Sequence, residues 1–364
     1  MKNTLGNNIS VTLFGESHGD SIGAVLDGIP AGVTVDDAFI NHQLDLRRPS
    51  GKISTPRKEA DAYKIISGVF NGKTTGTPIC VVIPNENTKS ASYELSYGKA
   101  RPGHADYVAF EKYNGCEDYR GGGHFSGRVT AGLVATGAIC IDLLKKKNIF
   151  IGTHIKKCAG VEDRAFDDLE KDIKELSVKE YPVLDSIQGE AMVKNIEKVA
   201  AEGDSVGGVL STAVTGIPVG IGEPWFDSLE SVLSHGLFSI PAIKGVEFGA
   251  GFSCADMKGS EMNDSFAIEN GVVVTKTNNN GGINGGISNG MPILFNCVVK
   301  PTPSIAKSQE TVDFINCENT VLSTKGRHDP CIVHRARVVV DSITAIVLCD
   351  MLSQKFGTDW LGAL

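Results

Sequence analysis

Short apolar segments separated by glycine-rich turns recur along the chain and limit its fold more than any other feature. Segments typical of strands are Ser10 to Phe14, Ser21 to Leu26, Ala62 to Val69, Ile79 to Ile83, Val206 to Thr215, Val272 to Lys276, Pro292 to Val299 and Ile332 to Val340. Segments typical of helices are Asp36 to Leu46 (N-capped by Thr34), Arg128 to Lys147, Phe166 to Glu180, Ser186 to Glu202, Asp227 to Phe238 and Ile343 to Lys355. Because strands and helices do not alternate regularly, the pattern favours α+β layers with antiparallel sheets over a doubly wound parallel sheet.

Glycine clusters indicate tight loops, and two of them imitate nucleotide-binding motifs. Gly68 to Thr74 has three residues between its glycines where a P-loop needs four, so we interpret it as a hairpin. Gly121 to Gly127 lacks the third glycine of the dinucleotide fingerprint and follows no apolar strand. The helix from Arg128 is expected to be thin and closely packed, because it carries Ala131, Gly132, Ala135, Gly137 and Ala138.

Composition indicates a globular protein. The 364 residues, 41% apolar and 21% charged, can bury the core of one large domain or two ordinary ones. We see neither a secretory signal nor an apolar run of about 18 residues, and therefore expect a cytoplasmic protein with no membrane partner. Nine cysteines without a C-x-x-C pair predict reduced thiols and no metal site.

The distribution of basic residues indicates a small anionic ligand. A net charge of -8 gives no reason to expect nucleic acid as a partner. Arginines nevertheless gather in groups, and guanidinium forks match carboxylate and phosphate oxygens. The groups are Arg47, Arg48, Lys52, Arg57 and Lys58, then Arg101, Arg120 and Arg128, then Arg327, Arg335 and Arg337.

Three polar loops carry candidates for proton transfer. They are Gly15 to Gly19 with His18, Arg101 to Tyr107 with His104, and Thr324 to Cys331 with Asp329. The first loop also matches the G-x-S-x-G serine elbow, which leaves a serine esterase using Ser17 open. An elbow needs a helix directly after it, whereas the following residues are typical of a strand.

Taken together, motifs along nearly the whole chain resemble the chorismate synthase family. They are Gly15 to Gly19, Arg47 to Pro49, Thr74 to Pro78, Arg101 to Tyr107, Asp118 to Gly123, Gly203 to Ser205, Lys244 to Glu247, Gly281 to Ile283, Lys300 to Thr302 and Gly326 to Cys331. The resemblance implies a single domain over residues 1–364, folded as a β-α-β sandwich with long central helices between two antiparallel sheets. It also implies a homotetramer.

The resemblance further implies a carbon-oxygen lyase of the shikimate pathway, which leads to the aromatic amino acids. Its reaction is the anti 1,4-elimination of phosphate from 5-enolpyruvylshikimate 3-phosphate to give chorismate. Reduced FMN is required without net redox change, either as a transient electron donor or as a base through a ring nitrogen. NADPH as an indirect reductant and an external flavin reductase are compatible with this family.

Residue roles also follow from the resemblance. His18 would protonate the departing phosphate, His104 would protonate the reduced flavin, and Asp329 would help to take a proton from it. Substrate or flavin anions would be held by Arg47, Arg48, Lys52, Arg128 and Arg327. Flavin contacts would come from His124, Phe125, Ser126, Pro241, Ala242, Gly285, Lys300, Pro301, Thr302, Pro303, Ser304 and Arg327.

The chain departs from the family pattern after the triple glycine. The family there reads Arg-Ser-Ser-Ala-Arg-Glu-Thr, whereas this sequence has His124, Phe125 and Ser126 followed by Gly-Arg-Val-Thr. Since the first arginine is lost, we hypothesise that Arg120 supplies compensating charge. A non-catalytic protein that binds anionic metabolites stays open as a second alternative, beside the esterase.

Overall fold

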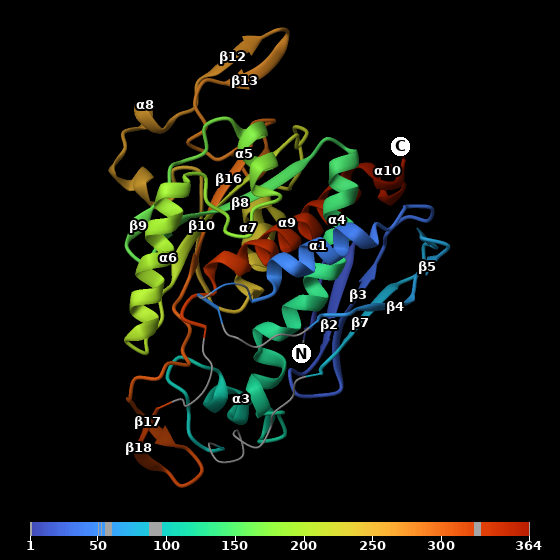
Figure 1. Cartoon of the computed structure of the whole chain (residues 1–364). Coiled ribbons are helices and arrows are strands. Elements are labelled where there is room, and N and C mark those ends of the chain that lie inside the picture. The colour runs from blue at the N-terminus through green and yellow to red at the C-terminus, as the bar shows by residue number, and fades with distance from the viewer. Residues whose placement is uncertain are drawn as a thin grey trace.

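Two antiparallel sheets enclose a layer of helices (Figure 1). The computed structural model describes residues 2–49, 51, 53–54, 60–86, 97–323 and 329–363. The first sheet has the order β1 (Thr4–Leu5), β2 (Ser10–Gly15), β3 (Ser21–Asp27), β7 (Ile79–Pro84) and β4 (Lys64–Ser67). The second has the order β11 (Ile243–Phe248), β16 (Ile293–Val299), β10 (Gly208–Thr215), β8 (Phe150–Cys158) and β9 (Val161–Glu162). The predicted α+β sandwich is confirmed.

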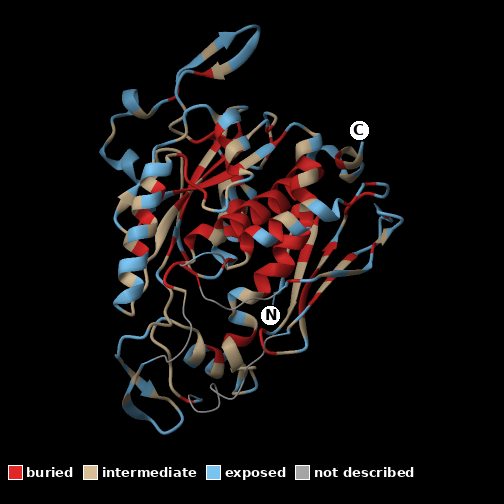
Figure 2. Ribbon diagram, viewed as in Figure 1, coloured by how far each residue is buried: buried red, intermediate tan, exposed pale blue. Residues whose placement is uncertain are grey.

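The helices between the sheets form the core. Helix α4 (Thr130–Lys146) packs on β3 and β7, α9 (Val333–Phe356) packs on β8 and β10, and the two helices pack on each other. Helices α1 (Asp37–Arg47) and α7 (Leu229–Ser239) contact α9 from its other sides. Buried residues are concentrated in α4, α9 and the inner strands (Figure 2). Each sheet therefore buries one face against helices and shares a single apolar interior.

Helix α4 is as thin as its sequence predicts. A Cβ added at Gly132 would lie 2.7 Å from the backbone carbon of Gly23 in β3. A Cβ added at Gly137 would lie 2.3 Å from the Cβ of Ser342 in α9. The two glycines thus let α4 approach the sheet on one side and α9 on the other.

Helix α4 also corrects the expectation that no segment has the length and composition of a membrane span. Residues Gly127–Lys146 pass that test by length and composition. Within the protein, however, 83% of the apolar window is buried. Packing between β3 and α9 therefore accounts for its apolar character.

The remaining elements lie around the sandwich. The helices are α3 (Asp106–Tyr113), α5 (Leu169–Leu176), α6 (Ser186–Ala201), α8 (Gly259–Met262) and α10 (Thr358–Gly362). The 3₁₀ segments are Arg120–Phe125, Gly127–Val129, Trp225–Asp227 and Gly251–Asp256. The hairpins are β5 (Val69–Phe70) with β6 (Lys73–Thr74), β12 (Phe266–Glu269) with β13 (Val272–Thr275), β14 (Ile283–Asn284) with β15 (Ile287–Ser288), and β17 (Gln309–Asp313) with β18 (Glu318–Leu322). The hairpin interpretation of Gly68 to Thr74 is confirmed by β5 and β6.

Two local predictions were wrong. The segment Ile332 to Val340 forms the first turns of α9 and not a strand. Because this helix is buried on all sides, it lacks the one-sided apolar stripe of a surface helix, and its run of valines imitates a strand. The cap of α1 is Asp36 and not Thr34, since the Asp36 Oδ1 accepts from the backbone N–H of Phe39 at 3.0 Å.

Candidate active site

The Gly15 to Gly19 loop connects two paired strands and presents His18. Strand β3 begins at Ser21, directly after the loop, so the helix that a serine elbow requires is replaced by a strand. The Ser17 hydroxyl is buried and donates to the Arg120 carbonyl at 3.2 Å. Since that hydroxyl proton is used, the Ser17 Oγ accepts from the His18 Nδ1, also at 3.2 Å. Proton exchange by His18 is therefore assigned to Nε2.

The triple glycine touches both candidate histidines. Gly121 and Gly122 have left-handed φ values of 60° and 87°. A Cβ at Gly121 would lie 2.1 Å from the Cε1 of His18, and one at Gly122 would lie 3.1 Å from the Cε1 of His104. The backbone N–H of Ser17 also donates to the Gly123 carbonyl at 3.1 Å. Consecutive residues without side chains thus bring the two imidazoles close to the same short segment.

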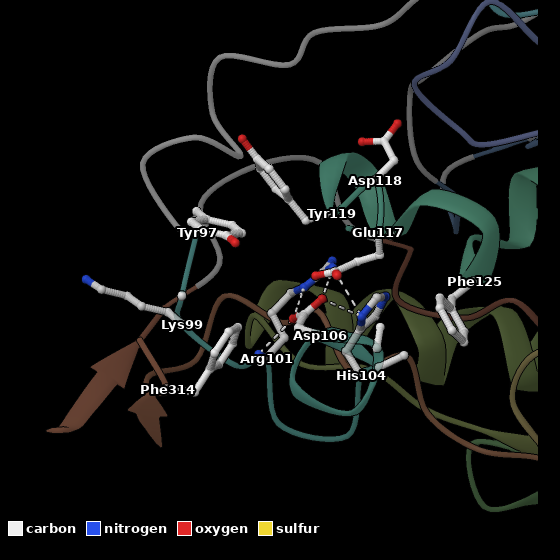
Figure 3. Close-up of a pocket in the computed structure, with 14 residues that line it drawn as sticks. Tyr97, Lys99, Arg101, His104, Asp106, Glu117, Asp118, Tyr119, Phe125 and Phe314 are labelled. Atoms are coloured by element: carbon white, nitrogen blue, oxygen red, sulfur yellow. Dashed lines mark hydrogen bonds and ion pairs between the residues drawn. The ribbon is translucent and has the colours of Figure 1, made fainter. Parts of the chain in front are cut away.

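His104 lines a small cavity beside the start of α3 (Figure 3). Its Nδ1 lies 2.8 Å from the Oδ1 of Asp106, which also pairs with Arg101 at 2.6 Å. Burial acts to raise the pKa of Asp106, but hydrogen bonds from His104 and Arg101 outweigh it and hold that pKa well below its usual range. An ionised carboxylate therefore backs the imidazole.

A larger cavity of about 290 Å³ collects arginines and carboxylates from distant segments. Its charged lining residues are Arg47, Asp61, Arg128, Asp329 and Arg335. Among these, three guanidinium groups outnumber two carboxylates. The predicted residues Ser126 and Pro241 lie in the same wall. Such a lining favours an anionic ligand.

Asp61 connects two of the arginines. Its Oδ2 lies 2.7 Å from the NH2 of Arg47, its Oδ1 pairs with Arg128, and Arg48 Nε lies 3.9 Å away. Burial acts to raise the pKa of Asp61, but Arg47 and Arg128 outweigh it and lower that pKa. Arg48 also pairs with Asp45 at the end of α1 and donates to the Ala60 carbonyl. Asp61 therefore stays ionised and keeps two cations side by side.

Asp329 lies next to one of the predicted flavin segments. Its carboxylate pairs with Arg335 from α9, and its carbonyl accepts from the Thr302 hydroxyl at 2.7 Å. The Nε atoms of Arg47 and Arg335 are buried without a hydrogen-bond partner among the described residues. Both guanidinium groups thus have donor capacity left for a ligand.

The segment Lys300 to Ser304 links three of the predicted regions. The backbone N–H of Lys300 donates to the Ala242 carbonyl at 2.9 Å, and its Nζ donates to the Gly103 carbonyl at 2.5 Å. A Cβ at Gly103 would also lie 3.6 Å from the Cβ of Pro303. Pro301 and Ser304 belong to the same connection. Predicted cofactor residues therefore border the loops of His104 and Asp329.

Other predicted residues lie apart from the cavity or outside the described residues. Gly285 lies in the turn between β14 and β15. The carbonyl of its neighbour Gly286 accepts from the backbone N–H of Leu229, where α7 begins, whereas Pro241 follows the other end of α7. The 11 residues of α7 separate these ends by about 16 Å. Lys52 and Arg327 lie outside the described residues.

The departure after the triple glycine has a structural consequence. The Nδ1 of His124 donates to the Gly15 carbonyl at 2.8 Å, so this hydrogen bond stabilises the start of the His18 loop. Phe125 lines the cavity of His104. Arg120 donates to both oxygens of Asp118 at 2.8 Å, so its charge is paired within the protein. Its compensation for the lost arginine stays a hypothesis.

Known proteins resemble this chain over nearly its whole length. Residues 9–353 match the sequence profile described as chorismate synthase. The chorismate synthase of Dehalococcoides mccartyi strain BAV1 is 47% identical over 353 residues, which are 96% of each chain. That of Aeropyrum pernix is 45% identical and covers 96% of this chain and 93% of its own. This chain belongs to the chorismate synthase family. It is therefore an enzyme, a carbon-oxygen lyase acting on a phosphate in chorismate and aromatic amino-acid biosynthesis.

The fold agrees with this family. A crystal structure titled as chorismate synthase superposes with a TM-score of 0.76 at 30% identity, covering 97% of this chain and 94% of that chain. Among the residues that sequence motifs singled out, Arg47 and Arg128 line the larger cavity, and the two histidine loops meet at the triple glycine. The motifs missed Asp61, whose role depends on contacts that only the fold creates. Arg335 was visible only as a member of a basic cluster.

Proposed function

We propose that the protein converts 5-enolpyruvylshikimate 3-phosphate to chorismate by anti 1,4-elimination, with reduced FMN bound beside the substrate. The observation that carries this proposal is the cavity in which arginines outnumber carboxylates. A substrate with two carboxylates and a phosphate is the kind of ligand that such a lining recognises. The histidine loops supply the proton donors that an elimination of phosphate requires. Asn85 connects the His18 loop to the cavity, because it donates to the Gly19 carbonyl and accepts from Arg128.

Two features fit an anionic cofactor at this site. The buried Nε atoms of Arg47 and Arg335 have no hydrogen-bond partner among the described residues. Ala242, next to Pro241 in the wall, has a left-handed φ of 75°, which non-glycine residues adopt at strained functional positions. Reduced FMN supplies transferable electron density to the reaction when bound. We assign Ser126, Pro241, Ala242 and the segment Lys300 to Ser304 to holding it.

The protein's own residues have separable tasks. Arg47 and Arg128 bind the anionic groups of the substrate and are kept together by Asp61. His18 donates a proton from Nε2 to the departing phosphate. His104 keeps its Nδ1 proton on Asp106 and exchanges a proton through Nε2, and the carboxylate of Asp329 receives one. General acid catalysis of this kind contributes roughly 100- to 10,000-fold.

We also propose a single domain that assembles as a homotetramer. One domain is supported by α4 and α9, which join the two sheets through a shared core. Association is supported by apolar side chains on the projecting β12–β13 hairpin, where Phe266 is 65% and Ile268 69% exposed. Mass photometry tests this, with the mass of four chains expected and that of one chain as the contradicting result.

An anaerobic assay tests the proposed reaction. The protein is incubated with 5-enolpyruvylshikimate 3-phosphate and either reduced or oxidised FMN, and chorismate is followed by its absorbance. We expect chorismate in the reaction with reduced FMN and none in the reaction with oxidised FMN. Absence of product with reduced FMN overturns the proposal. Addition of NADPH and oxidised FMN then tests whether the chain reduces its own flavin or depends on an external reductase.

A further inference from the structure

We propose that Asp106 is a positioning residue that fixes the tautomer of His104, so that this histidine exchanges its proton through Nε2. The tautomer is a property of the protein without ligands. The partner in proton exchange, a bound flavin, rests on the proposed function. The two parts can therefore be tested separately.

The Asp106 carboxylate is held by four hydrogen bonds (Figure 3). Its Oδ2 accepts from the Arg101 backbone N–H at 2.9 Å and from the Arg101 Nε at 2.8 Å. Its Oδ1 accepts from the Arg101 NH2 at 2.6 Å and faces the His104 Nδ1 at 2.8 Å. An ionised carboxylate only accepts hydrogen bonds, so the proton between Oδ1 and Nδ1 belongs to the ring.

One contact argues for the opposite tautomer. The Arg101 NH2 also lies 3.1 Å from the His104 Nδ1, as it would if the guanidinium donated to an unprotonated nitrogen. That arrangement would set the lone pair of Nδ1 against the carboxylate at 2.8 Å. The NH2 already donates to Asp106 at the shorter distance of 2.6 Å. The carboxylate therefore decides the tautomer, and the guanidinium serves to hold the carboxylate in place.

The opposite edge of the ring faces the triple glycine. A Cβ at Gly122 would lie 3.2 Å from the His104 Nε2, so the ring is confined between Asp106 and that glycine. The other ionisable side chains around this cavity are Tyr97, Lys99, Glu117, Asp118, Tyr119 and Lys300. Glu117 is the matched control, because it is a second carboxyl in the same wall and its Oε2 has no hydrogen-bond partner among the described residues.

The test replaces Asp106 by asparagine. Oδ2 accepts from two N–H groups of Arg101 and Oδ1 from one, so the amide oxygen of the new side chain will take the Oδ2 position. Its NH2 group will face His104, and the Arg101 NH2 loses its acceptor. An NH2 group donates to Nδ1 and so selects the tautomer protonated at Nε2. Nitrogen-15 NMR of labelled histidine at alkaline pH, where the ring is neutral, reads the tautomer of wild type, Asp106→Asn and Glu117→Gln.

We expect the Nδ1–H tautomer in the wild type and in Glu117→Gln, and the Nε2–H tautomer in Asp106→Asn. We also expect kcat of Asp106→Asn to fall by about 100-fold or more, as for other histidines held in the wrong tautomer, with little change in KM. An Nε2–H tautomer in the wild type overturns the proposal, as does wild-type kcat in a variant whose tautomer has switched. A wild type without chorismate synthase activity overturns the proposed function but leaves the tautomer result standing.

Discussion

Replacing Gly121 by alanine tests how the triple glycine positions His18. The added Cβ would lie 2.1 Å from the Cε1 and 2.2 Å from the Nδ1 of His18. Ordinary contact begins at 3.4 Å, so the ring must retreat by about 1.3 Å or the loop must open. The φ of 60° adds strain of roughly 1–2 kcal/mol for alanine.

We expect this displacement to lower turnover by about 100-fold, because misplacing a catalytic group by about 1 Å has effects of that size. The assay is anaerobic chorismate formation with reduced FMN, accompanied by thermal unfolding. Gly160→Ala is the matched control, since its φ of 80° carries similar strain while nothing lies within 4 Å of the new Cβ. Gly160→Ala should lower the stability of the protein and leave turnover unchanged. Turnover of Gly121→Ala within about threefold of the wild type would refute the argument that this glycine positions His18.

His18→Ala should lower turnover by about 100-fold or more while flavin affinity, measured by titration, stays unchanged; wild-type turnover would contradict its role. Asp61→Asn removes the shared counterion of Arg47 and Arg128 and should destabilise the protein without ligands by roughly 3–5 kcal/mol. Bound substrate should then raise the melting temperature of Asp61→Asn by more than it raises that of the wild type. An equal rise in both proteins would argue against Asp61 as the counterion of these two arginines. Burial acts to raise the pKa of Asp61, but the two arginines outweigh it and lower that pKa below 3.8. The ionised Asp61 therefore stabilises the folded protein above pH 3.8, and this stabilisation is lost as the pH falls further. Acid unfolding of Asp61→Asn should accordingly be flatter below pH 3.8 than that of the wild type. Gly137→Ala should cost about 1–3 kcal/mol in chemical unfolding, because its Cβ would lie 2.3 Å from a side-chain carbon of α9.

The sequence predicts those parts of the fold in which local pattern and tertiary environment agree. The β2–β3 hairpin is readable because apolar residues alternate on strands that bury one face. The first half of α9 cannot be recognised in this way. A helix buried on every side lacks a one-sided apolar stripe, so Val338 to Val340 resemble a strand. Strand β8 (Phe150–Cys158) was also missed, since the polar residues in its centre obscure the apolar run.

The candidate site divides in a similar way. The loops of His18 and His104 combine glycine with a titratable side chain in short stretches, which makes them visible in the sequence. Asp61 has no such context, because its contacts with Arg47 and Arg128 exist only once a loop, α1 and the 3₁₀ segment before α4 meet. The pairing of Arg120 with Asp118 is likewise visible only in the structure.

The most direct test of the whole account follows phosphate and flavin together in one anaerobic reaction. The protein, reduced FMN and 5-enolpyruvylshikimate 3-phosphate are mixed, and released phosphate, chorismate and the flavin absorbance are recorded. We predict one phosphate and one chorismate for each substrate consumed, with the flavin still reduced at the end. Absence of phosphate release, or oxidation of one flavin for each product formed, would contradict an elimination without net redox change.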